Sequence, residues 1–188
     1  MAEPGYQSLI SYKLAQLAFD LGWEFVPLYY HKYEDNRQRD QIKQALRSLK
    51  QNIVEGSSER SLSSKLKLYD VAKASGMEAR EDFEDILRRM GLLRWSKDDL
   101  RFVKLRHIFE SSPSTSFSLP SIFTWVHQKE LEGRGGLEEI VNYELDLLIR
   151  CGYLLDQQIR AVEKKHTEEG GYNENLLKKR LRYRNKTS

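Results

Sequence analysis

Hydrophobic residues near the start of the chain recur every three or four positions, the spacing that gathers side chains on one face of an α-helix. The pattern predicts a first helix from Leu9 to about Tyr30, then a turn over His31 to Asn36, because Pro27 and the charges after it weaken continuation. A second helix is expected to end at Gly56, since glycine is typical of helix ends. Its inner face carries Ile42, Ala45, Leu46, Leu49 and Ile53.

A third helix is predicted after the serines at 61, 63 and 64, whose side-chain oxygens are suited to capping a helix start. Its hydrophobic pattern runs to Arg89 or Met90. Small residues in its middle, among them Ala72, Ser75 and Gly76, favour the close approach of a neighbouring helix. A tolerated, exposed glycine is the alternative.

Residues 93–134 depart from this pattern and predict an insertion or long connection. We expect a short helix over Asp98 to Glu110, a serine-rich loop over Ser111 to Ser121, and a second short helix over Ile122 to Glu132. The pair Gly135-Gly136 is then expected to reset the chain before a long fourth helix.

The fourth long helix is predicted from Leu137 to about Thr167, and Gly170-Gly171 separates it from a final basic segment. Leu176, Leu177 and Leu181 support a short amphipathic helix there. The predicted fold class is therefore all-α: an antiparallel four-helix bundle over residues 1–168, with inserted short helices, and a basic C-terminal suffix over residues 169–188.

Positive charge is concentrated at the C-terminus. The formal net charge is +3, but six basic residues and no acid follow Glu174, so the remainder of the chain carries −3. Such a segment is suited to contacting phosphate, although a solvated terminus explains it equally well. The basic residues are Lys178, Lys179, Arg180, Arg182, Arg184 and Lys186.

A second basic group lies on the second helix. Its members are spaced by four, four and three positions, so they stand one above another on a helix face where that helix offers no acid. We name this group the ridge, and it comprises Arg39, Lys43, Arg47 and Lys50. It predicts a phosphate-binding surface in the body of the protein.

A single cysteine, Cys151, excludes an intramolecular disulfide and a multi-cysteine zinc cluster, and indicates a reduced, cytoplasmic protein. The segment after Pro4 and Gly5 is amphipathic and charged rather than an apolar signal region. No uncharged run approaches the length that spans a membrane, so neither export nor membrane insertion is expected.

The sequence lacks the motifs of common catalytic centres, and we expect neither an enzyme nor a bound cofactor or metal. The histidines at 31, 107, 127 and 166 do not have zinc-hydrolase spacing, and carboxylate pairs such as Glu81-Asp82 and Glu84-Asp85 are typical of solvated helix faces. Neither a phosphate-binding glycine loop nor a serine nucleophile elbow is present. The aromatic residues Trp23, Tyr29, Tyr30 and Tyr33 suit base stacking or, more simply, packing.

The segment Ser48 to Ser57 (SLKQNIVEGS) and the segment Ala72 to Glu78 (AKASGME) resemble four-helix-bundle proteins related to the ribosomal-RNA intervening-sequence proteins. The same superfamily includes the accessory variability determinants of diversity-generating retroelements. That resemblance implies a basic homopentameric barrel that assists a reverse transcriptase. The C-terminal part, with Leu154 to Gln158 and Gly170 to Tyr172, looks like the suffix of a longer subgroup.

The resemblance covers residues 6–92 and 137–184, whereas residues 93–134 depart from the short family members. At the turn that follows the first motif we expect a structural polar network between helices rather than a reaction. Its members are Asn52, Glu55, Arg60 and Glu78.

Two hypotheses remain. In the first, the ridge and the basic suffix bind RNA or DNA by charge and shape, in a homo-oligomeric accessory protein. In the second, the same cations pair with acids of a neighbouring subunit, and the chain is a structural or protein-interaction bundle. Salt dependence of nucleic-acid binding separates the two.

Overall fold

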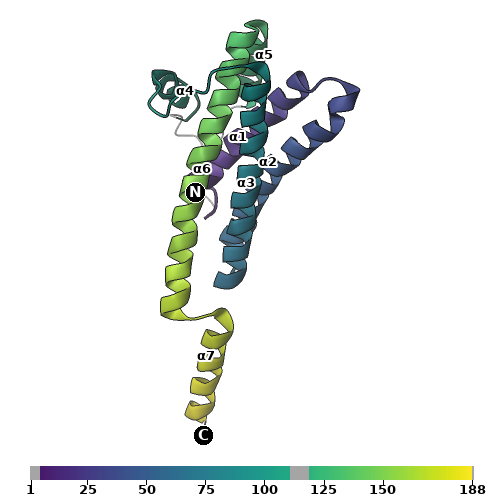
Figure 1. Cartoon of the computed structure of the whole chain (residues 1–188). Helices are drawn as coiled ribbons and strands as arrows, with labels where there is room; N and C mark the ends of the chain where they lie inside the picture. The colour runs from purple at the N-terminus through teal and green to yellow at the C-terminus, as the bar shows by residue number, and fades with distance from the viewer. Residues whose placement is uncertain (1–4, 111–118, 188) are drawn as a thin grey trace.

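The computed structural model describes residues 5–110 and 119–187, and all regular secondary structure in these ranges is helical (Figure 1). This confirms the all-α prediction. A short 3-10 turn, η1 (Tyr33–Asp35), precedes the second helix. The helices are α1 (Ile10–Tyr29), α2 (Asn36–Ser58), α3 (Leu62–Met90), α4 (Leu100–Glu110), α5 (Leu119–Leu131), α6 (Arg134–Glu169) and α7 (Tyr172–Thr187).

Local sequence signals account for the ends of α3. The Ser61 side chain accepts a hydrogen bond from the Ser64 amide at 3.4 Å, as an N-cap does, and Gly91 ends the helix in the left-handed region at φ 58°. Both ends agree with the sequence expectation. Of the predicted loop Ser111 to Ser121, residues 111–118 lie outside the described residues, and the rest belongs to α5.

Two glycine predictions are wrong. Gly56 lies inside α2, and a Cβ there would meet the Tyr69 ring at 2.7 Å, so the glycine permits close packing rather than ending the helix. Gly135 and Gly136 likewise lie in the first turn of α6, which begins at Arg134 rather than at Leu137. A Cβ on Gly136 would stand 1.9 Å from the carbonyl oxygen of Lys129, because α5 and α6 nearly touch there.

Helices α1 and α3 each pack against both α2 and α6. The contacts between α2 and α3 show that the two run in opposite directions: the Gln38 amide donates to Asp82 at 2.7 Å, and ten residues further along α2 the Ser48 hydroxyl accepts from Ser75 at 2.8 Å. The neighbouring long helices are likewise antiparallel in Figure 1, where α6 descends beside the ascending α3.

The segment predicted as an insertion supplies part of the core. Trp95, Phe109 and Val126 are buried in the same hydrophobic cluster as residues of α1, α2, α3 and α6. The Phe109 ring stacks on Tyr143 of α6 with a centroid separation of 5.5 Å. Helices α4 and α5 therefore cover the side of α6 that the long helices leave open, and α5 also packs against α1.

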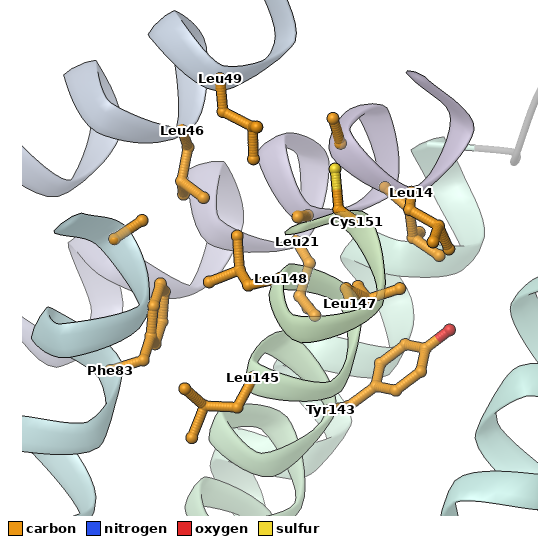
Figure 2. Close-up of a cluster of buried hydrophobic side chains, with 14 of the residues drawn as sticks. Leu14, Leu21, Leu46, Leu49, Phe83, Tyr143, Leu145, Leu147, Leu148 and Cys151 are labelled. Atoms are coloured by element: carbon orange, nitrogen blue, oxygen red, sulfur yellow. The ribbon is translucent and has the colours of Figure 1, made fainter. Parts of the chain in front are cut away.

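The centre of the core is formed by leucines from α1, α2 and α6 around Phe83 (Figure 2). Cys151 is buried there, which raises the pKa of its thiol to about 12, so it behaves as a small apolar residue. None of the helices in the described ranges has the length and apolarity needed to cross a membrane.

One acid lies in this core without a partner among the described residues. Glu144 of α6 is 0% exposed, and neither carboxylate oxygen forms a hydrogen bond within that part of the chain. Its Oε1 lies near Gly22 of α1, 3.9 Å from where a Cβ would stand. Burial, with the negative charge of Asp20 as a smaller cause, raises the pKa of Glu144 well above its ordinary value, so the folded protein holds this side chain protonated.

We predict that Glu144 lowers stability as the pH rises. The unfolded chain releases this proton near the ordinary value of 4.5 whereas the folded chain keeps it, so the free energy of unfolding falls as the pH increases above that value. Replacing Glu144 with Leu should raise the free energy of unfolding at pH 7 by about 1–3 kcal/mol. Urea denaturation across a pH series measures this.

Glu144→Gln removes the same proton while keeping the shape, and should also remove this part of the pH dependence. Glu163→Gln, on an exposed position of the same helix, is the matched control and should change little. A stability gain from Glu144→Leu that is the same at low and neutral pH would contradict the assignment.

Replacing the neighbouring glycines Gly135 and Gly136 of α6 with alanine should change the free energy of unfolding in opposite directions. Gly136→Ala should cost about 2 kcal/mol or more, because the Cβ meets backbone that cannot yield without moving α5. Gly135 has no atom within 4 Å of a Cβ, so Gly135→Ala should stabilise α6 by about 0.5–1 kcal/mol. Chemical denaturation of the two variants checks this, and equal effects would refute the close contact.

Candidate nucleic-acid interface

The ridge on α2 lies against aromatic residues of α1. The Lys43 ammonium stands 3.9 Å from the centroid of the Trp23 ring, and the Lys50 ammonium stands 3.6 Å from that of Phe19. The two rings also contact each other, with centroids 5.4 Å apart. Two of the four predicted cations are thus engaged in cation–π contacts, which the spacing on α2 alone does not reveal.

The remaining two ridge residues are more available. Arg47 is exposed, and Arg39 is half-buried with its Nε 3.8 Å from the Asp40 carboxylate. An ion pair of that length next to solvent is weak. Phosphate binding on this face would therefore begin with the two arginines.

Acids of α1 reach the ridge as well. Burial lowers the pKa of Lys50, Arg47 lowers it further, and the nearby Asp20 carboxylate opposes both. Burial and then Arg39 lower the pKa of Lys43, against the nearby acids. The acid-free face expected from α2 is therefore a mixed surface once α1 is in place.

Helix α7 carries the second predicted group of cations. Gly170, at φ 79°, ends α6, and α7 extends past the ends of α2 and α3 (Figure 1). The side chains of Lys178, Lys179, Arg180, Arg182 and Arg184 are exposed. The one acid of this helix, Glu174, lies in its first turn, where it accepts a hydrogen bond from the Gly171 amide at 3.2 Å. The structure does not bring this group and the ridge together into one patch.

The predicted polar network does not assemble. The Asn52 amide donates to the Ser48 carbonyl at 2.8 Å, whereas Glu78 accepts from Gln41, about three turns earlier in α2. Glu55 follows Gln41 by 14 residues, which places it about 20 Å further along α2 than the Gln41 contact. Glu55 and Arg60 are both exposed.

A different polar network joins α4 to α6. Asp146 accepts from Arg106 and from Arg150, and Arg150 also donates to both oxygens of Glu110 at 2.7 Å. The Tyr143 hydroxyl donates to the same Glu110 at 3.3 Å. These paired charges fix α4 on α6, a structural role that sequence reasoning missed. The placement of Asp146 within an apolar stripe, four residues before Arg150, was the available signal.

No metal-binding arrangement is found in residues 5–110 and 119–187. No group of three or more His, Cys, Asp or Glu side chains there is placed to hold a metal ion. Two of the carboxylates considered above have other partners: Asp82 accepts from Gln38, and Glu84 lies 3.2 Å from Arg94.

Comparison of this chain with protein-family models, with curated proteins and with solved structures finds no match. The resemblance to the intervening-sequence proteins therefore stays a prediction.

The ridge cations should differ in their effect on stability. Lys43→Gln and Lys50→Gln should each lower the free energy of unfolding by about 0.5–1 kcal/mol, because each removes a charge that is attracted to a ring. Arg47→Gln, the matched control on the same face, should change it by less than about 0.5 kcal/mol. Denaturation followed by far-UV circular dichroism measures all three, and an equal response would argue against the cation–π contacts.

Proposed function

We propose that the protein is a non-catalytic nucleic-acid-binding accessory protein, with α7 as its principal phosphate-binding element. The observation that supports this most directly is the position of α7, which projects past the ends of α2 and α3 with the five exposed cations named above and a single acid at its start. When an exposed lysine or arginine binds a phosphate, mainly water and counterions are released. Such binding is favourable and weakens as the salt concentration rises.

The α1–α2 face is proposed as a secondary contact. Arg39 and Arg47 supply charge there, and Trp23, 48% exposed beside Lys43, supplies a flat apolar surface on which a base can stack. This combination favours charge and shape over sequence, since phosphate contacts carry no base information. Both RNA and DNA are candidate ligands.

The proposal extends to the fold family. Helices α1, α2, α3 and α6, packed as antiparallel neighbours, are interpreted as an antiparallel four-helix bundle with α4 and α5 added on one side, as the resemblance implies. The same resemblance suggests a cytoplasmic accessory protein that assists a reverse transcriptase.

Self-association is part of the proposal, with a pentamer implied by the resemblance. A hollow of about 330 Å³ between α3 and α6, with both apolar and charged walls, supports an interface there. Exposed Met77, Ile149 and Tyr153 line it, as does Gly152, where a Cβ would have no atom within 4 Å. Exposed apolar residues gathered at a groove are typical of protein–protein contacts.

The alternative is a protein-interaction bundle that does not bind nucleic acid. The contacts of Lys43 and Lys50 with the rings of α1 favour it, because a lysine that stabilises a fold does not need a phosphate. Under this alternative, removing ridge charges would disturb stability or assembly rather than nucleic-acid binding.

Binding to labelled structured RNA and duplex DNA across a salt series tests the proposal. The wild type should bind at low salt and lose affinity steeply as salt increases. Changing Lys178, Lys179, Arg180 and Arg182 to Gln should reduce the slope of log affinity against log salt by about 0.7–0.9 for each phosphate that the variant no longer neutralises. Changing Arg39 and Arg47 to Gln should have a smaller effect.

The matched control removes the same number of charges from exposed positions elsewhere, at Lys67, Lys97, Lys104 and Arg160. Sedimentation of every variant reports its assembly state. Absence of binding by the wild type at low salt, or an equal loss in the control, would sink the nucleic-acid proposal and leave the protein-interaction bundle.

A further inference from the structure

A separate pocket of about 260 Å³ opens where the end of α1 meets the turn between α5 and α6. It is at the opposite end of α6 from α7 (Figure 1), so it does not belong to the proposed phosphate-binding surface. The walls are almost entirely apolar and come from α1, α3 and α6: Phe25, Leu28, Tyr29, Met90, Leu137 and Ile140.

The aromatic residues of α1 give this pocket a fixed shape. Phe25 is buried and stacks on Tyr29 with centroids 5.9 Å apart, and it also contacts Phe83 in the core at 6.1 Å. Side chains held in this way do not collapse easily into the empty space. A preformed apolar pocket with a few polar groups at its rim is typical of a small-molecule site.

Arg134 places a positive charge at the rim. One guanidinium nitrogen, Nη2, donates to the carbonyl oxygens of Met90 and Gly91 at 2.8 and 3.2 Å, which anchors the group at the end of α3. Among the described residues no acceptor is bonded to Nε or Nη1, so both retain donors for a ligand. A fixed guanidinium is well suited to a carboxylate.

The rim also has one acid, Glu130, which has a partner on its own helix. Its carboxylate lies 3.4 Å from Nδ1 of His127. Arg134 is also the first residue of α6, a helix with no acid in its first turn, which adds to the positive potential. The rim therefore favours an anion over a cation.

The volume limits the size of the ligand. A protein cavity of about 150 Å³ accepts benzene, so this pocket has room for one aromatic ring and a short aliphatic chain. We propose that the pocket binds a small apolar carboxylate, with its ring or chain against Phe25 and Leu137 and its carboxylate on Arg134.

Methionine methyl NMR of the full chain provides the test, because the chain has only Met1, Met77 and Met90. Met90 lines this pocket, whereas Met77 lies in the α3–α6 hollow and serves as an internal control. Titration with phenylbutyrate should shift the Met90 signal in a saturable manner and leave Met77 unchanged. Phenylbutanol and phenylbutylamine have the same apolar part with a neutral and a cationic head.

Phenylbutyrate should bind about fivefold more tightly than phenylbutanol, and phenylbutylamine should bind most weakly. Arg134→Gln should abolish the preference for the acid while phenylbutanol still binds, and Arg160→Gln, the control further along α6, should preserve it. Leu137→Trp, which fills the pocket, should prevent binding of all three compounds. Circular dichroism confirms that each variant is folded.

No shift of Met90 at saturating phenylbutyrate would overturn the site. Equal binding of the acid and the alcohol, or tighter binding of the amine, would overturn the role of Arg134 and with it the proposed ligand class. Neither result depends on nucleic-acid binding, so this inference and the proposed function fail or succeed separately.

Discussion

Helix α6 is enclosed on all sides between Ile140 and Leu148, and this burial is the constraint on which the rest of the structure depends. A helix on the surface of a protein buries one face and leaves the other in water. Every residue of this stretch is buried, so neighbours must surround it. Helices α1 and α3 cover one side, and α4, α5 and the segment that precedes α4 cover the other.

Enclosure explains why Leu93, Trp95 and α4 form hydrogen bonds with polar side chains of α6. Asn142 is fully buried and accepts from the Trp95 amide while donating to the Leu93 carbonyl, both at 2.8 Å. Asp146 likewise accepts a hydrogen bond from Arg106 of α4. Leaving a buried neutral amide without such partners costs about 1–3 kcal/mol of stability, and leaving a buried carboxylate without them costs more. Glu144 is the exception, and protonation is the way it avoids burying a charge.

The sequence predicted the helices well where the signal is local. The serine cap at Ser61 and the left-handed Gly91 act on their own helix, so spacing and residue type are sufficient. Gly56 and Gly136 were misinterpreted because their function is to admit Tyr69 and the backbone at Lys129, residues of other elements. The sequence alone does not distinguish a glycine that ends a helix from a glycine that allows close contact, because the difference depends on the neighbouring element.

The candidate site shows the same division. Helical spacing placed the ridge residues on one face of α2, but it could not place Trp23 beneath Lys43 or Asp20 beside Lys50, because those contacts depend on how α1 crosses α2. The network around Glu55 and Glu78 failed for a related reason. Antiparallel packing sends positions near the end of α2 to the start of α3, and Glu78 lies in the second half of α3, beside Gln41.

These contacts also decide where anion binding has most to gain. A ridge lysine that leaves its ring for a phosphate gives up about 0.5–1 kcal/mol, so its net contribution is smaller than that of a free cation. In α7, anion binding would relieve an unfavourable interaction instead of breaking a favourable one. Lys178 and Arg182, four residues apart, repel each other, and such pairs destabilise a helix by about 0.2–0.5 kcal/mol each. A phosphate bound there would remove that repulsion while it formed new contacts. An anion that binds α7 therefore stabilises the helix that binds it, and it does so without changing the enclosed core around α6.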